Sequence, residues 1–233
     1  MNEDILQYYT ATQVRELNRL AIDEHQVTGF ELMRRAGKVA FDLLLAEWPD
    51  VERVIIFCGS GNNGGDGFII AGLAMEQGLL ADVFVFGNGA SIKGDAQKAL
   101  AYARKWHTPI QFQTEPPVLP PAGAKVVMVD ALLGTGLAGD VRTPFRLAIE
   151  AMNRTDFPVL AVDIPSGLCS DTGNILGACV EATITVTFIC RKIGLVRRYG
   201  SEMCGRVVCD ELGLPPELYR QINGTSMLRN EAE

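Results

Sequence analysis

Three short segments of this 233-residue chain combine residue types that could bind a phosphate-bearing ligand and move a proton. They are "GSGNNGGDG" (residues 59–67), "DALLGTGLAGD" (130–140) and "DIPSG" (163–167), and each follows a hydrophobic run. Glycines let phosphate oxygens approach backbone N–H groups, above all at the start of a helix. Carboxyl side chains can give and take a proton. We therefore expect one ligand site built from these segments.

The first segment matches the dinucleotide-binding pattern G-x-G-x-x-G through Gly59, Gly61 and Gly64. The match alone is weak, because a dehydrogenase also needs an acidic residue at the end of the second strand to hold a ribose. Here that strand ends in "VFVFGNG", and Asp82 lies at its opposite end. No Gly-Lys-Ser/Thr follows, so the segment is not a P-loop. A hydride-transferring dehydrogenase is therefore disfavoured.

The polar residues of the first segment allow two interpretations. Asn tolerates left-handed backbone geometry, and Asp66 could cap a helix that begins near Gly67, so their role could be local. Alternatively, they line a ligand site. Asp130 and Asp163 favour the second interpretation, because each directly follows a hydrophobic strand. A carboxylate buried there is costly unless it meets a cation, a hydrogen-bond donor or a ligand.

Asn63, Asp130 and Ser166 carry oxygen atoms that are hard metal ligands. Such a set suits a metal bound through oxygen, and the sequence offers no plausible Cys/His set for zinc. On its own, this constellation leaves the identity of the metal open.

Hydrophobic, β-branched runs alternate with helix-like segments from residue 53 onward, which predicts the elements that position these side chains. The expected strands are "RVIIFCG", "ADVFVFG", "TPIQFQ", "AKVVMVDALLG", "FPVLAVDIPSG", "ATITVTFI" and "GRVVCDELG", and the expected helices are "DGFIIAGLAMEQG", "KGDAQKALAYARKW" and "TPFRLAIEAMNRTD". Strands that are apolar along their whole length indicate a parallel sheet covered on both faces. The predicted fold is α/β, a doubly wound, mostly parallel, Rossmann-like sheet in three layers.

Two amphipathic helices precede this sheet. Thr10 with Gln13, and Thr28 with Glu31, have the spacing of capping boxes. The apolar stripes behind them predict packing surfaces and make a homodimer plausible. We expect a single domain over residues 1–220, with a Pro-rich connector at 114–124, and a polar tail or linker over 221–233.

Composition excludes several classes of protein. Hydrophobic residues make up 48% of the chain, which supports a sizeable core, and the net charge of −7 gives no footprint for nucleic acid. The apolar runs are shorter than the roughly 20 residues of a membrane span. The six cysteines have irregular spacing, which predicts free thiols. Together these features predict a soluble, cytoplasmic protein that does not act on membranes or nucleic acid.

An ordered set of motifs resembles the YjeF N-terminal domain family, the NAD(P)H-hydrate epimerases. The motifs are "LMRRAG" (32–37), "GNNGGDGF" (61–68), "VDALLGTGL" (129–137), "VDIPSGL" (162–168) and "TFICRKIGL" (187–195). The resemblance runs from about residue 10 to 215. It implies interconversion of the R and S epimers of NADH or NADPH hydrated at C6 of the nicotinamide ring. The functional partner is then an ADP- or ATP-dependent NAD(P)H-hydrate dehydratase specific for the S epimer.

The resemblance also assigns roles to residues by position. The metal is a potassium ion, bound by Asn63, Asp130 and Ser166, and the group near the reacting centre is Asp163. We expect Asp163 to be the catalytic group, which gives and takes the proton in the reaction. Its alternative role is a strand-end cap or a contact behind the potassium ligands. The residues that would bind the hydrated dinucleotide are Asn62, Asn63, Gly64, Gly65, Asp66, Gly134, Thr135, Gly136, Leu137, Ala138, Gly139, Asp140 and Asp163.

Weaker candidates and alternatives remain. Lys192 follows a strand and could reach a phosphate, whereas His25 and His107 lie near predicted helix ends, where surface or capping roles are commoner. A non-catalytic binding module of the same fold is the alternative function. The chain is expected to be either a stand-alone epimerase or the N-terminal half of a bifunctional epimerase/dehydratase. The sequence does not distinguish NADH-hydrate from NADPH-hydrate preference.

Overall fold

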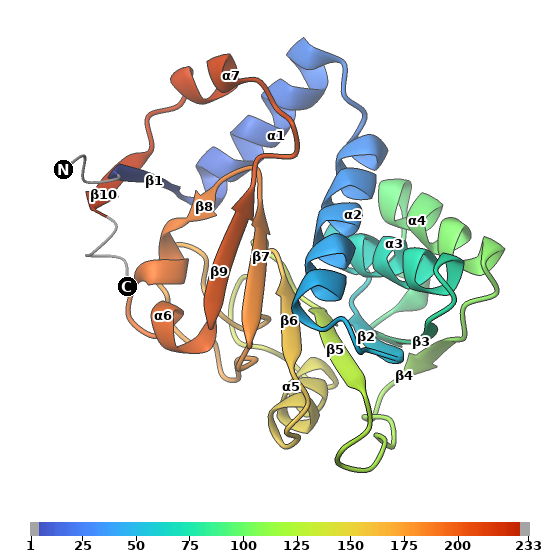
Figure 1. Ribbon diagram of the computed structural model, residues 1–233. Coiled ribbons are helices and arrows are strands. Elements are labelled where there is room, and N and C mark those ends of the chain that lie inside the picture. Colours follow the sequence, from blue (N-terminus) through green and yellow to red (C-terminus); the bar gives the residue numbers. More distant parts are fainter. Residues whose placement is uncertain (1–4, 229–233) are drawn as a thin grey trace.

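A seven-stranded parallel sheet forms the centre of the molecule in the computed structural model, which describes residues 5–228 (Figure 1). The strands follow the spatial order β4-β3-β2-β5-β6-β7-β9. Their bounds are β2 Arg53–Cys58, β3 Leu80–Phe86, β4 Ile110–Gln113, β5 Val126–Ala131, β6 Val159–Val162, β7 Ile184–Phe188 and β9 Arg206–Asp210. Each predicted strand is present, and the predicted doubly wound fold is confirmed.

The order of the strands reverses between β2 and β5, which are neighbours in the sheet although β3 and β4 lie between them in sequence. Their register pairs Cys58 with Ala131, so the two strands end level with each other. In open α/β sheets, ligands bind at such a switch point, outside the carboxyl ends of the strands. The first two polar segments of the sequence begin there.

Side chains of the central strands alternate between two apolar layers. In β2, Val54 and Ile56 join the core beneath α2, α3 and α4, whereas Ile55 and Phe57 join the core beneath α5. Helices therefore cover both faces of the sheet, as Figure 1 shows. The helix bounds are α1 Ala11–His25, α2 Gly29–Glu47, α3 Asn62–Glu76, α4 Gly94–Lys105, α5 Phe145–Asn153, α6 Gly200–Met203 and α7 Pro216–Arg220, with 3-10 turns η1 Gly89–Ser91 and η2 Ile193–Val196.

The two N-terminal helices begin where the sequence predicts. Thr10 and Gln13 form the reciprocal capping box of α1. Thr28 accepts a hydrogen bond from the Glu31 backbone at the start of α2, but the Glu31 carboxylate bonds Arg35 instead of returning to the cap. The apolar stripes of both helices are buried within the single chain. They give no support to a homodimer, which stays a prediction.

A second, small sheet was not anticipated. β1 (Ile5–Tyr9) lies between β10 (Thr225–Leu228) and β8 (Arg191–Lys192), antiparallel to the former and parallel to the latter. β10 belongs to the segment that we expected to be a polar tail or linker, and residues 229–233 of that segment lie outside the described residues. Because β8 follows β7 closely, its pairing with β1 brings α1 to the carboxyl end of the main sheet.

Other expectations concern the chemistry of the whole chain. The six cysteines are free thiols, as predicted. Among residues 5–228, no helix combines the length and the hydrophobicity that crossing a bilayer requires. The Pro-rich connector runs between β4 and β5 without helix or strand.

Candidate active site

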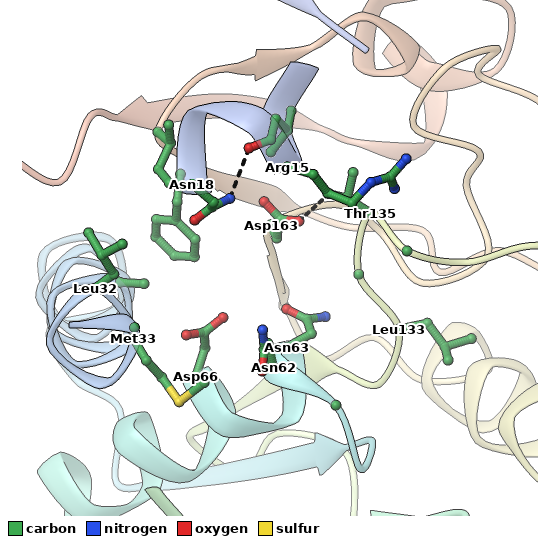
Figure 2. A pocket seen from close by; sticks show the side chains of 18 of the residues that line it. Arg15, Asn18, Leu32, Met33, Asn62, Asn63, Asp66, Leu133, Thr135 and Asp163 are labelled. Atoms are coloured by element: carbon green, nitrogen blue, oxygen red, sulfur yellow. Dashed lines mark hydrogen bonds between the residues drawn. The ribbon is translucent and has the colours of Figure 1, made fainter. Parts of the chain in front are cut away.

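A pocket of about 710 Å³ lies at the carboxyl ends of the central strands. This volume is within the range of small-molecule sites. All three polar segments contribute to its wall, together with α1, α2 and the turn before Lys192. Figure 2 shows Asp66 and Asn63 on α3 facing Asp163 and Thr135 across the open space. The expected convergence of the segments is therefore present.

The helix that follows β2 starts earlier than the sequence indicates. Gly61 is the N-cap of α3, and helical residues begin at Asn62 instead of near Gly67. Asp66 is therefore not the cap. It lies three residues after Asn63, so the two side chains share one face of the first turns. Gly61 supplies no side-chain cap, which leaves N–H groups of the first turn available to an anionic ligand.

Glycines in this segment serve the packing of α3 as well as the ligand site. A Cβ at Gly64 would lie 2.0 Å from the Gly59 carbonyl oxygen, and one at Gly65 would lie 2.6 Å from the Met33 Sδ atom. Neither Gly64 nor Gly65 lines the pocket. They let the start of α3 approach β2 and α2 closely, which holds Asn63 and Asp66 at the pocket wall.

Asp163 follows β6 with a left-handed backbone, at φ 72°. Its carboxylate accepts a 2.5 Å hydrogen bond from the Thr135 hydroxyl and forms an ion pair with Lys192. Burial raises the pKa of Asp163, but the charge and hydrogen bond of Lys192 outweigh burial and leave this pKa below its ordinary value. Asp163 is therefore ionised at neutral pH.

Lys192 is 1% exposed, and its ammonium group is fully used inside the protein. Besides Asp163, it donates to the Thr187 hydroxyl at 2.8 Å and to the Phe188 carbonyl oxygen at 2.9 Å. An ammonium group has three N–H donors. No donor of Lys192 is left for a ligand phosphate. Instead of the expected phosphate contact, Lys192 holds Asp163 in place.

Asp66 has a different environment, although it lines the same pocket. Its side chain makes no hydrogen bond or ion pair with any residue in the described range, and only 9% of the residue is exposed. Burial raises the pKa of Asp66 well above its ordinary value, and repulsion by Asp163 raises it further, while Lys192 lowers it in part. This shift widens the pH range over which Asp66 is the neutral acid.

Two of the three expected potassium ligands, Asp130 and Ser166, contact each other outside the pocket lining, whereas Asn63 lines the pocket. Asp130 and Ser166 are fully buried, and Ser166 donates to the Asp130 carboxylate from its hydroxyl at 2.6 Å and from its backbone N–H at 2.7 Å. Burial raises the pKa of Asp130 to about 6, although the hydrogen bonds from Ser166 and Leu132 oppose this rise. No ion pair to Asp130 occurs among the described residues.

Asn63, the third expected potassium ligand, lines the pocket and has an unusual feature. Both polar atoms of its side-chain amide are buried without a hydrogen-bond partner. An orphaned buried amide is costly and calls for a ligand. The oxygen donors of Asn63, Asp130 and Ser166 therefore fit a hard monovalent or divalent cation. Among the described residues, no cluster of three or more His, Cys, Asp or Glu side chains offers a competing metal site.

The remaining expected binding residues divide into two groups. The loop after β5 lines the pocket from Gly134 to Ala138, whereas Gly139 and Asp140 do not reach it. His25 and His107 also lie outside the pocket. His25 ends α1, and His107 is exposed just after α4, so both have the peripheral positions expected of them.

Several lining residues were missed by the sequence reasoning. Arg15 and Asn18 of α1, and Leu32 and Met33 of α2, form the wall opposite the loop after β5 (Figure 2). Arg15 is exposed at the rim and donates to Thr12, and it pairs with no carboxylate in the described part of the chain. The sequence signal was weak, because the position of α1 depends on the unpredicted pairing of β1 with β8.

Several known proteins resemble this chain in sequence. The sequence profile of the family described as YjeF-related protein N-terminus matches residues 29–194. A bifunctional NAD(P)H-hydrate repair enzyme of Coxiella burnetii is 42% identical over 214 residues, covering 92% of this chain and 43% of that protein. An NAD(P)H-hydrate epimerase of Legionella pneumophila is 34% identical over 223 residues, covering 93% of this chain and 81% of that protein. The chain thus spans less than half of the bifunctional relative.

A solved structure shares the fold. The crystal structure of the yeast protein ynu0 superposes with a TM-score of 0.77 and covers 97% of this chain and 98% of its own. At 17% identity, this likeness concerns the arrangement of helices and strands.

Proposed function

This chain belongs to the YjeF-related protein N-terminal family, and from that premise we propose that it is an NAD(P)H-hydrate epimerase. It would interconvert the R and S epimers of NADH and NADPH hydrated at C6, as an isomerase that repairs the damaged cofactor. The observation that carries the proposal is the meeting of three polar segments at one pocket, where two carboxyl groups with opposite pKa shifts face each other. Relatives named for this activity support it.

The pocket supplies the contacts that a hydrated dinucleotide needs. Free N–H groups at the start of α3, beside Gly61 and Asn62, suit the pyrophosphate. The loop from Gly134 to Ala138 offers further backbone on the same side, and Arg15 adds a positive charge at the rim. The hydrated ring would then lie between Asp163 and the apolar wall of α2.

The chemistry requires proton transfer and no redox step. When the C6 hydroxyl is protonated, the lone pair of the ring nitrogen can expel water and form a planar iminium ion. Water that returns to the opposite face inverts C6. Asp163 touches the reacting centre in this proposal, and its carboxylate stabilises the positive charge of the iminium ion.

A potassium ion fits the buried donors of Asn63, Asp130 and Ser166. When bound, it would supply a fixed positive charge next to the Asp130 carboxylate and a partner for the orphaned Asn63 amide. Asn63 and Ser166 lie on α3 and on the loop after β6, so the ion would tie both to β5. This arrangement would fix the position of Asp163, three residues before Ser166.

An ADP- or ATP-dependent dehydratase specific for the S epimer is the proposed functional partner. The bifunctional Coxiella relative, of which this chain covers 43%, supports a fused dehydratase domain as one form of this partnership. A cytoplasmic location stays a prediction. The alternative function, a non-catalytic module that binds the dinucleotide, has less support because every polar side chain of the proposed site is present.

The test uses an epimer mixture of hydrated NADH, an S-specific dehydratase with its nucleotide, and potassium. Without an epimerase, conversion has a fast phase and then a slow remainder set by spontaneous epimerisation. We expect that adding this protein moves all of the substrate into the fast phase. If the slow remainder persists while the protein binds the dinucleotide, the protein is the binding module instead. Repeating the assay with hydrated NADPH gives the preference between the two substrates.

A further inference from the structure

We propose that Asp66 and Asp163 act as a pair of carboxyl groups on opposite faces of the reacting carbon, with Asp66 protonating the departing hydroxyl and Asp163 accepting a proton from the entering water. This inference rests on the proposed epimerase function and deepens it. It divides between two residues the proton transfer that the sequence alone suggested for Asp163.

The geometry places the two carboxyl groups on different walls of one pocket. Asp66 projects from the second turn of α3, and Asp163 projects from the end of β6. Figure 2 shows Asp66 on α3 and Asp163 at the end of β6 at different places around the same open space. Thr135 and Lys192 hold only Asp163, which leaves the Asp66 carboxyl free to meet a ligand.

The surroundings shift the pKa values of the two carboxyl groups in opposite directions. The ion pair with Lys192 holds Asp163 as a carboxylate, whereas burial and the negative charge of Asp163 keep the pKa of Asp66 raised. The other charged residues of the pocket wall are Arg15 on α1 and Asp95 on α4, and the lining residues of α2 are uncharged. Below Asp66, the Cys58 thiol of β2 has a raised pKa because it is buried, so it stays neutral. Environments that separate two pKa values in this way typically distinguish an acid from a base.

Inversion at C6 explains why two groups are needed. Water must leave from one face of the ring and enter from the other, and one fixed carboxyl group can serve only one face. Enzymes that invert a sugar centre use the same arrangement, with an acid and a base flanking a cationic transition state. The iminium ion formed here carries the same kind of charge.

The proposed steps balance in atoms and electrons. Asp66 gives its proton to the C6 hydroxyl, the C6–O bond breaks with its electron pair on the leaving water, and the nitrogen lone pair forms the C6=N1 double bond. A second water forms a C6–O bond on the opposite face, the double-bond pair returns to N1, and the water proton passes to Asp163. That proton then moves through pocket water to Asp66, the stronger base, which restores both groups. The other epimer follows these steps in reverse.

The test compares Asp66→Asn with wild type and with Asp42→Asn, an exposed aspartate of α2 outside the pocket. General acid catalysis contributes about 10²–10⁴-fold. We expect Asp66→Asn to lose at least about 100-fold in kcat while it still binds intact NADH, and Asp42→Asn to keep its kcat. Activity of Asp66→Asn within about threefold of wild type would overturn the inference.

A pH profile supplies a readout that a merely structural role would not change. The kcat of wild type should fall on the alkaline side, as Asp66 loses its proton at a pH above the usual aspartate range. This measurement needs no variant, and a profile that stays flat from pH 5 to 9 would overturn the inference. In Asp66→Ala, added formate should restore part of kcat, whereas no restoration in a folded variant would count against the donor role. If the wild type lacks epimerase activity, the proposed function is wrong. If the wild type is active and Asp66→Asn is equally active, only the inference about Asp66 is wrong.

Discussion

At the scale of single residues, Lys192 decides the charge of the proposed site. The type of residue was apparent in the sequence, but its role was not, because its three hydrogen-bond partners come from backbone and side chains that only the folded turn brings together. Polar residues at the ends of hydrophobic runs are conspicuous in a sequence. The place of Asp163, Asp130, Asn63 and the loop after β5 in the site was therefore predictable. The place of Arg15 was not, because nothing in its helix distinguishes it from other surface arginines.

Replacement of Lys192 should therefore destabilise the protein strongly. Lys192→Met leaves the partly buried Asp163 carboxylate without its cation, and loss of one partner of a fully buried pair, about 3–5 kcal/mol, is the upper limit of the cost. Denaturant unfolding at pH 7 measures the loss. The double variant Lys192→Met/Asp163→Asn should regain part of it. Lys125→Met, which breaks the exposed pair with Glu52, should cost less than about 1 kcal/mol.

The same variant carries a pH signature. The pKa of Asp163 lies below 3.8 in the folded protein, and the pKa of Lys192 lies above 10.5. The stabilisation from Asp163 is therefore complete above its unfolded pKa and is lost as pH falls through the folded value. The stabilisation from Lys192 is complete below its unfolded pKa of 10.5 and is lost as pH rises through the folded value. The stability difference between wild type and Lys192→Met should be constant near neutral pH and shrink at both extremes; a difference that grows in acid would contradict the ion pair.

At the scale of elements, the start of α3 is where sequence reasoning and structure differ. Hydrophobic runs predicted all seven strands of the main sheet, because strands buried on both faces have a plain signature. Asn and Gly disfavour helix, so the sequence placed the helix start near Gly67. Close packing against β2 and α2 overrides that preference and begins the helix at Asn62.

Gly64 and Gly61 provide a matched pair to test this packing. A methyl group at Gly64 would overlap the Gly59 carbonyl, whereas one at Gly61 meets nothing within 4 Å. We expect Gly64→Ala to lower the free energy of unfolding by about 1–3 kcal/mol or more, and Gly61→Ala by less than about 1 kcal/mol. Thermal melts of both variants check this. Equal losses would mean that the helix start tolerates displacement from β2.

At the scale of the whole molecule, the proposed cation links three parts of the fold, namely α3, β5 and the loop after β6. The oxygen set was visible in the sequence, since Asn63 lies at the start of α3, Asp130 lies at the end of β5 and Ser166 lies in the loop after β6. The small sheet of β1, β8 and β10 was not, because its strands are short and their pairing is set by contacts distant in sequence. Its effect on the site is indirect, through the position of α1.

Potassium should accordingly stabilise the entire fold. An ion that binds only the folded state adds about 2.7 kcal/mol at a concentration 100 times its dissociation constant. We expect the Tm to rise by several degrees in potassium chloride relative to tetramethylammonium chloride at equal ionic strength. Asp130→Asn should abolish this difference and Asp42→Asn should keep it. The same Tm in both salts for wild type would argue against a cation at these residues.

The left-handed backbone at Asp163 limits which residues this position can accept. Only glycine, asparagine and aspartate adopt such a conformation at low cost, and β-branched residues rarely do. A descendant of this chain that lost its carboxyl group without losing its fold would therefore be expected to carry asparagine or glycine at position 163. The residue type at position 163 would then show whether a related protein of this fold has retained the proposed chemistry or only the fold.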